Sequence, residues 1–152
     1  YGLLPPGFSA EHFGPNDAFY WDDFWAVAGL RDIAFSAGIL NKKKDKQIFL
    51  NEYKLFWKDI IRSLEFCEKK FHNKIIPSSP YRRIDPSVIG SIVSLYPLRL
   101  FHPKDQRMTE TLRVIRKQWM ENFAFFHRII HSGYNVYLTC HIAQCYLFRK
   151  SF

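Results

Sequence analysis

Two kinds of helical segment alternate along this chain, and that alternation constrains the fold more than any other feature. Segments at about 17–36, 86–95 and 134–148 are apolar or aromatic with little charge, whereas those at about 45–71 and 105–120 have one charged and one apolar face. A helix that is apolar on most sides needs burial on most sides, while an amphipathic helix needs it on one. We therefore expect two layers, with the apolar helices inside and the amphipathic helices outside.

Local signals indicate where these segments begin and end. Asn16 or Asp17 can cap the first segment, and Asp85 followed by Pro86 is typical of a helix start. The chain shows almost no strand pattern, so we predict an all-α fold, an array of α/α hairpins. One short extended piece, at about 123–130, leads to a turn at Ser132–Gly133.

A loop with polar or special residues precedes each inner segment, at 5–17, 77–85 and 127–135. If the inner helices run parallel, the three loops gather at one end of the fold. Binding and catalytic residues are concentrated on loops that a rigid scaffold positions. A functional site is therefore expected at that end.

Charge is divided unevenly between the start of the chain and the rest. Residues 1–41 hold five carboxylates against one arginine, a net charge of −4, although the whole chain carries +8. Aromatic residues lie among these acids, at Tyr20, Trp21, Phe24 and Trp25. Sugar sites need this combination, because rings stack on sugar faces while carboxylates bind hydroxyls or move protons. The alternative interpretation is an amphipathic helix whose aromatic stripe faces the core.

Composition argues against several other classes of protein. The basic excess is spread out, with Lys42–Lys44 as its only short run, so we expect a solvated face and no nucleic acid partner. Cys67, Cys140 and Cys145 have no metal-ligand spacing and no even number, which predicts buried thiols and a cytoplasmic or otherwise reducing setting. No apolar run approaches the length of a membrane span, and no signal peptide is visible.

Three stretches of the chain carry a resemblance to a known group of enzymes. They are residues 2–7 with 20–25, residues 76–85 with 90–91, and residues 125–126 with 131–139. They resemble the six-hairpin (α/α) toroid glycosidases, the architecture of glucoamylase-like and trehalase-like enzymes. Tyr20-Trp-Asp-Asp-Phe-Trp25 is similar to the aromatic-Trp-Asp-x-aromatic-Trp pattern of the trehalase-like members. The resemblance covers most of the chain and implies a single partial (α/α)6 toroid domain over residues 1–152.

A closed toroid of six hairpins needs more helices than the five expected here. We therefore expect a C-terminal fragment of a longer protein, with the rest of the sugar cleft supplied by further sequence or a second chain. The resemblance implies hydrolysis of α-glucosides or related glycans, although the isolated piece need not be active. The alternative class is a non-catalytic helical interaction module, because an open arc exposes apolar helix flanks. A further alternative is polyanion binding through the basic stretch 42–70.

Glycoside hydrolysis requires two carboxyl groups on either side of the scissile bond. Glu11, in the first loop, and Asp85, at the start of an inner helix, are the predicted catalytic pair. A plain loop acid and an N-cap are the alternative interpretations of these two residues. Asp22 matches the acid of the trehalase-like pattern, which by resemblance binds sugar hydroxyls near the reacting ring. Asp23 stands where that pattern has a neutral residue, and its role is open.

Further side chains are predicted to hold the sugar. They are the rings of Trp21, Trp25 and Tyr81, the cation Arg82, and the polar residues His131 and Asn135. Arg82 can clamp an anionic sugar or pair with Asp85, and we favour the pairing. His127 and His131 are four residues apart, but no third ligand is near, so we expect no metal site. No cofactor motif is present, and no cofactor is expected.

Overall fold

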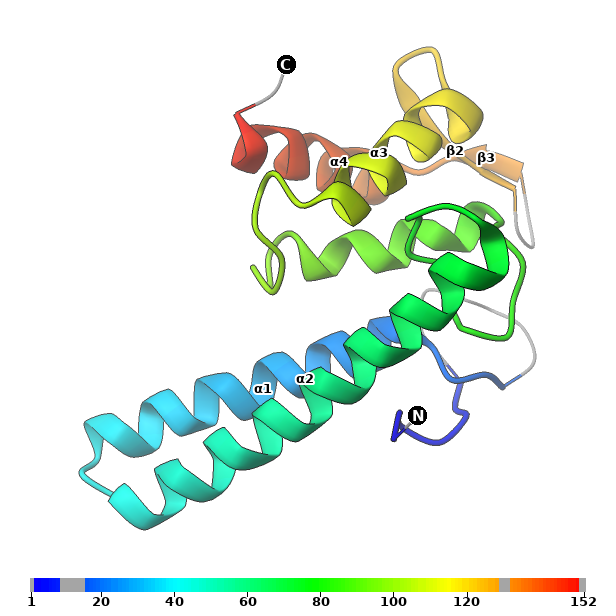
Figure 1. Ribbon diagram of the computed structural model, residues 1–152. Coiled ribbons are helices and arrows are strands. Elements are labelled where there is room, and N and C mark those ends of the chain that lie inside the picture. Colours follow the sequence, from blue (N-terminus) through cyan, green and yellow to red (C-terminus); the bar gives the residue numbers. More distant parts are fainter. Residues whose placement is uncertain (1, 9–15, 129–131, 151–152) are drawn as a thin grey trace.

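The structure, a computed structural model, describes residues 2–8, 16–128 and 132–150 (Figure 1). Among these residues, the helices are α1 (Tyr20–Ile39), α2 (Lys43–Phe71), the 3-10 helix η1 (Pro86–Ser94), α3 (Gln106–Trp119) and α4 (Val136–Arg149). Three short strands, β1 (Met120–Glu121), β2 (Ala124–Arg128) and β3 (Ser132–Tyr134), form an antiparallel sheet in that order. The expectation of a mostly helical chain is confirmed, whereas the all-α prediction is wrong over the three strands.

The extended piece between α3 and α4 forms a sheet because it folds back on itself. Phe126 lies opposite Tyr134 across β2 and β3, and the two rings meet edge to face with centroids 5.2 Å apart. Ser132 and Gly133 belong to β3 and do not form the turn that the sequence predicts. Strands this short are too brief to show an alternating pattern, so their pairing was not visible in the sequence.

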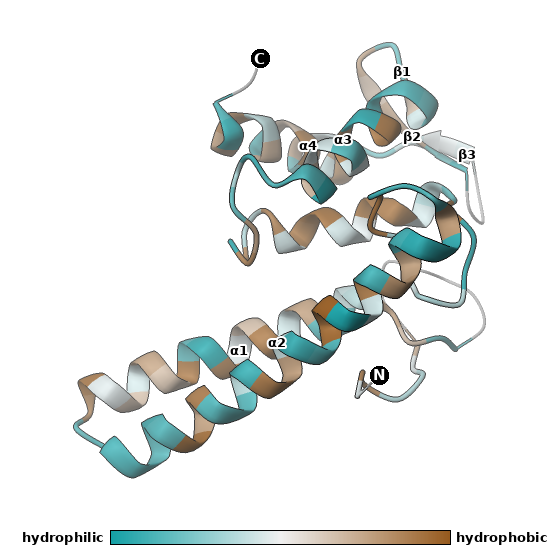
Figure 2. Cartoon of the chain, in the orientation of Figure 1, coloured by the Kyte–Doolittle hydropathy of each residue, from teal (hydrophilic) through white to brown (hydrophobic). Residues whose placement is uncertain are grey.

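Of the three helices predicted to be inner, only η1 is buried on most sides, because α1 and α4 leave large apolar side chains such as Phe35 and Val136 exposed. The helices α1, η1 and α4 all begin on the same side of the molecule, and η1 contacts both of the others (Figure 1). Of the two helices predicted to be outer, α2 packs on α1 and α3 packs on η1. Every residue of η1 after Pro86 is buried, whereas α2 is amphipathic, with hydrophilic and hydrophobic residues alternating along it (Figure 2). The described helices do not close into a ring, so the toroid stays a proposal.

The start of α1 is tied to the second loop, not to a cap of its own. The N-cap is Phe19, which makes no side-chain capping bond, so the cap predicted at residues 16–17 is wrong. Asp17 Oδ1 instead accepts the hydroxyl of Ser79 at 2.8 Å. The Tyr20 N–H donates to the carbonyl of Ser78 at 2.9 Å. The first and second loops are therefore joined by hydrogen bonds at the start of α1.

A buried polar contact joins α1 to α2. The Tyr20 side chain is fully buried, and its hydroxyl lies 2.6 Å from Ser63 Oγ and 3.4 Å from Cys67 Sγ. Burial raises the pKa of the Tyr20 phenol, so the group stays neutral. The contact satisfies polar groups that the surrounding apolar core would otherwise leave without water.

We expect Tyr20→Phe to lower the free energy of unfolding by about 1–2 kcal/mol, because Ser63 loses its partner inside the core. Urea unfolding followed by circular dichroism measures this loss. The matched control is Tyr81→Phe, since the Tyr81 ring is 65% exposed and should change stability by less than about 0.5 kcal/mol. Equal effects of the two substitutions would contradict the assigned role of the Tyr20 hydroxyl.

Candidate functional site

The described parts of the three loops lie at the end of the molecule where α1, η1 and α4 begin (Figure 1). In addition to the bonds between the first two loops, the hydroxyl oxygens of Ser87 and Ser78 lie 2.7 Å apart, which joins the second loop to η1. In the third loop, the Asn135 N–H donates to the Phe125 carbonyl at 3.0 Å, just before α4 begins. The predicted gathering of the loops is confirmed for the part of the chain that the structure describes.

Asp85 is held by two groups of Ser87 in η1 and by Arg82 of its own loop. Its Oδ1 accepts the Ser87 N–H at 2.9 Å and also the Ser87 hydroxyl, and its Oδ2 lies 3.3 Å from Nη2 of Arg82. The Arg82 guanidinium in turn lies 5.8 Å from the centre of the Phe19 ring. The predicted N-cap and the predicted pairing with Arg82 are confirmed. These contacts account for Asp85 structurally, and its catalytic role stays a prediction.

Two adjacent carboxyl groups in the first turn of α1 lie in different environments. Asp23 is fully buried, and burial, together with the nearby charge of Asp22, raises its pKa to about 6. Its Oδ1 accepts the Leu4 N–H at 2.9 Å, and its Oδ2 has no hydrogen-bond partner among the described residues. Asp22 is half-buried, and burial raises its pKa as well. The buried acid of this pair is therefore Asp23, to which the sequence assigned no role.

Helical spacing could have revealed the position of Asp23. It stands three residues after Tyr20 and four before Val27, and residues at these spacings share one face of a helix. Both neighbours are completely buried. The resemblance points to Asp22, which is half-buried, whereas the helical face that enters the core carries Asp23.

Asp23 also holds together the two halves of the first motif stretch. Its bond to Leu4 joins residues 2–7 to residues 20–25, and an antiparallel bridge between Gly7 and Asp17 closes the loop further. Gly2 has φ +70°, and a Cβ on it would lie 2.3 Å from Asp59 Oδ2. Glycine alone suits that conformation and that close approach. The motif therefore packs the N-terminal segment against the first hairpin.

A pocket of about 400 Å³ opens between the inner helices α1 and α4, over the end of η1. It is lined by Trp21, Trp25, Val93, Tyr96, Pro97, Tyr137, Cys140, His141 and Gln144. The Trp21 and Trp25 rings lie 6.0 Å apart at a tilt of 60°. The Trp25 and Tyr137 side chains are exposed, so aromatic rings from two helices are accessible to a ligand at the pocket.

His141 supplies a neutral polar group in the wall of this pocket. Its Nε2 lies 2.6 Å from the Tyr96 carbonyl, which only accepts, so Nε2 carries the proton and Nδ1 is an acceptor. Nδ1 has no hydrogen-bond partner among the described residues. Burial lowers the pKa of His141, which favours the neutral ring. A ligand hydroxyl is a suitable donor for such a nitrogen.

Sequence reasoning missed the residues that α4 contributes. Tyr137, His141 and Gln144 follow one another at spacings of four and three, which places them on one helix face. That spacing was readable, but the segment was interpreted as a mostly buried helix. The thiols were predicted to be buried as well, and this is correct for Cys67 and Cys145 but wrong for Cys140, which is exposed.

The predicted site residues do not all come together. Trp21 and Trp25 line the pocket, whereas Tyr81 is exposed in the second loop and is not among the lining residues. Asn135 caps α4, with Oδ1 accepting the Leu138 N–H at 3.0 Å. Two predicted residues lie outside the described residues: Glu11 and His131. The sugar-binding and catalytic roles of all these residues stay predictions.

The described residues contain neither a metal-binding cluster nor a membrane-spanning helix. No group of three or more His, Cys, Asp or Glu side chains in residues 2–8, 16–128 and 132–150 is placed to hold a metal ion. None of the helices that the structure describes combines the length and the apolar character needed to cross a membrane. The pocket between α1 and α4 is therefore the candidate site that we carry forward.

Comparison of the chain with models of protein families, with curated proteins and with solved structures found no match. The likeness to toroid glycosidases thus rests on the motifs alone. A fold supports many activities, so the function has to be argued from the side chains of the site.

Proposed function

We propose that this chain forms part of the carbohydrate-binding cleft of a six-hairpin (α/α) glycoside hydrolase that acts on α-glucosides or related glycans. One observation carries the proposal: exposed rings of Trp25 and Tyr137, from two different inner helices, line one pocket with His141 and Gln144. A sugar offers apolar C–H faces for rings and hydroxyls for polar groups. This pocket presents both kinds of partner.

The charge of the pocket favours a neutral sugar. No Asp, Glu, Lys or Arg is among its described lining residues. The carboxyl of Asp22 belongs to the same turn of α1 as Trp21, and by resemblance it binds hydroxyls of the sugar next to the reacting bond. A neutral pocket with a carboxylate nearby suits a glucoside better than an acidic sugar.

Acid and base roles are proposed for Glu11 and Asp85, again by resemblance. In an inverting enzyme the two carboxyl groups stand roughly 6.5–9.5 Å apart, which leaves room for the attacking water. Asp85 would need to exchange its bond with Arg82 or Ser87 for one with the substrate. Further hairpins, from additional sequence or from a second chain, would supply the opposite wall of the cleft.

The test is titration of the chain with maltotriose, followed by the NMR signals of the tryptophan indole N–H groups. We expect the Trp21 and Trp25 signals to shift, and Trp25→Ala or Tyr137→Ala to weaken binding about fivefold to tenfold, because one stacked ring is worth about 1 kcal/mol. Both side chains are exposed, so their removal should leave the fold intact.

Phe35→Ala is the matched control, since it removes an exposed ring from the same helix but outside the pocket. Cellotriose, with β linkages, tests the proposed preference for α-glucosides. Maltotriose that shifts none of the pocket signals at millimolar concentration would refute the proposed function. So would equal weakening by Phe35→Ala and Trp25→Ala.

A second candidate function, a non-catalytic helical interaction module, is favoured by the far end of the α1–α2 hairpin. This end projects beyond the other helices (Figure 1), and Phe35, Ile39 and Leu40 there are 66–70% exposed. Large exposed apolar patches mark interaction sites. Sedimentation at increasing protein concentration tests this second function. Association of the chain would support it, provided that maltotriose changes neither the association nor the NMR signals of the pocket.

A further inference from the structure

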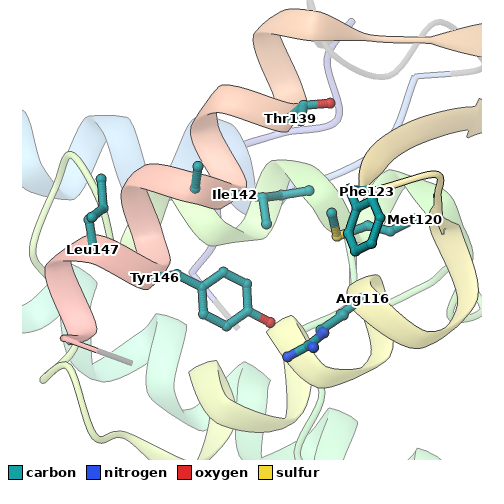
Figure 3. A pocket seen from close by; sticks show the side chains of 8 residues that line it. Arg116, Met120, Phe123, Thr139, Ile142, Tyr146 and Leu147 are labelled. Atoms are coloured by element: carbon teal, nitrogen blue, oxygen red, sulfur yellow. The ribbon is translucent and has the colours of Figure 1, made fainter. Parts of the chain in front are cut away.

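A second hollow, on another flank of α4, is an apolar groove of about 440 Å³ (Figure 3). It is lined by Arg116, Met120, Phe123, Thr139, Ile142, Ala143, Tyr146 and Leu147. Figure 3 shows the rings of Phe123 and Tyr146 facing each other across the groove, with Arg116 near the Tyr146 hydroxyl. The groove shares no lining residue with the pocket between α1 and α4.

The groove continues along α3 and α4. A neighbouring hollow of about 250 Å³ is lined by residues of both helices and shares Arg116 and Tyr146 with the first. The two helices have 14 residues each, so each is about 21 Å long. A continuous trough beside helices of this length suits a helix of about four turns.

The turn between β1 and β2 holds a large apolar side chain over this groove. Phe123 is 96% exposed, and both Asn122 and Phe123 have positive φ values, of 47° and 64°. A left-handed backbone costs a residue other than glycine about 1 kcal/mol or more. The chain therefore carries local strain that keeps an exposed ring at the edge of an apolar trough.

Arginine side chains give the groove its charge. Arg113, Arg116 and Arg149 line the two hollows, and no described acid lines either of them. Arg113 already pairs with Glu110, with Nη2 2.6 Å from Oε2, so Arg116 and Arg149 are the cations that carry the argument. Nη1 of Arg149 is buried and has no hydrogen-bond partner among the described residues, although Nη2 donates to Thr109 Oγ1 at 2.8 Å. A buried guanidinium N–H without an acceptor is costly, so the site lacks an anionic or carbonyl partner.

Among the described residues α4 touches the outer helix α3 through the bond from Arg149 to Thr109, but it contacts α3 less closely than α1 contacts α2. The helix α2 packs on α1, and α3 packs on η1. A helix lying in the groove would contact α4 on one side and α3 on the other. It would cover the exposed rings in the way that an outer helix covers an inner one.

We propose that this groove binds an acidic amphipathic helix of a partner protein. Its apolar face would lie on Ile142, Ala143 and Tyr146, and its carboxylates would pair with Arg116 and Arg149. Helix-in-groove recognition uses anchors at helical spacing on one face, and guanidinium–carboxylate contacts add orientation. This interaction is independent of the proposed sugar site, because the two surfaces share no residue.

The probe is a fluorescein-labelled synthetic peptide of about 18 residues, with leucine at helical spacing on one face and glutamate beside it. We expect the peptide to bind the chain, and Arg116→Glu to weaken binding about tenfold, because it places like charges together. Fluorescence anisotropy measures both affinities. A second peptide with lysine in place of every glutamate should bind the Arg116→Glu variant better than the unchanged chain.

Two variants separate the groove from general electrostatics. Lys117→Glu makes the same change of charge one residue further along α3, outside the groove, and should change affinity less than about twofold. Ala143→Trp fills the floor of the groove without changing charge and should also weaken binding about tenfold. Thermal unfolding by circular dichroism checks that each variant is folded.

Three results would overturn the proposal. The first is absence of peptide binding, and the second is equal weakening by Arg116→Glu and Lys117→Glu. The third is a chain that forms a dimer which Ala143→Trp disrupts, with no binding of the acidic peptide. That third result would assign the groove to a second copy of the chain.

Discussion

Asp23→Asn should stabilise this protein by about 3 kcal/mol near pH 8 and by almost nothing near pH 4. The pKa of Asp23 rises from 3.8 to about 6 on folding, chiefly because the carboxyl is buried. A shift of one unit corresponds to about 1.4 kcal/mol between the two protonation states. Asparagine keeps an oxygen that can accept the Leu4 N–H and carries no charge at any pH, so the substitution resembles the protonated acid.

The direction of this pH dependence follows from proton binding. Between pH 3.8 and about 6 the folded state holds the Asp23 proton more tightly than the unfolded state does. The contribution of Asp23 to stability is therefore fully present below pH 3.8 and is lost as the pH rises through about 6. The Asn variant has no carboxyl that could lose a proton. The difference in free energy of unfolding between this variant and the unchanged chain therefore grows as the pH rises.

Urea unfolding of both proteins at several pH values measures the difference. Asp32→Asn is the control, because it removes an exposed carboxyl from the same helix. A stability difference between Asp23→Asn and the unchanged chain that is constant from pH 4 to pH 8 would show that Asp23 does not titrate as a buried acid.

Asp85→Ala should cost about 2–3 kcal/mol of stability. The alanine removes the cap of η1, which is worth about 1 kcal/mol, and leaves the buried Ser87 hydroxyl and the Arg82 guanidinium without this partner. Asp85→Asn keeps the capping oxygen and should lose only about 1 kcal/mol, mainly through the pair with Arg82. Urea unfolding measures both variants.

Asp105→Ala is the comparison for the cap alone. Asp105 caps α3 through its bond to the Arg107 N–H at 2.8 Å, so its removal should cost about 1 kcal/mol. The amount by which Asp85→Ala loses more free energy of unfolding than Asp105→Ala measures what the contacts with Arg82 and Ser87 add. If the two alanine variants lose the same stability, Asp85 is only a cap.

The Asp85→Asn variant also tests the proposed catalytic role of Asp85. In an active enzyme that contains this chain, Asp85→Asn would abolish hydrolysis while leaving the protein folded if the carboxyl moves a proton. Full activity of Asp85→Asn would assign Asp85 to structure alone and remove it from the proposed catalytic pair.

Particular residues show which side-chain contacts could be predicted from the sequence. The cap at Asp85 and its pairing with Arg82 were predictable, because both depend on residues within a few positions along the chain. Asp17 was read by the same rule as a possible helix cap, but it binds Ser79, which is 62 residues away. Local capping rules hold where no distant partner competes for the same oxygen.

In the candidate site, too, some residues could be predicted from a local pattern and others could not. The sequence pointed to Trp21 and Trp25, because an aromatic run among acids is a local pattern. It did not point to His141, because its role depends on the Tyr96 carbonyl, 45 residues earlier in the chain. An apolar helix can present one polar face to a pocket, and only its neighbours reveal which face that is.

The sequence by itself determined the helices and their alternation of apolar and amphipathic character, because apolar periodicity acts over a few residues. Only the tertiary structure decided that α1 and α4 share a pocket, that β2 pairs with its neighbours, and that Asp23 is the buried acid. The pocket and the burial of Asp23 depend on contacts between segments that are distant in sequence, whereas the strand pairing is local but too short to leave a pattern. Contacts between distant segments are chosen by the packing of the whole chain, which no local pattern encodes.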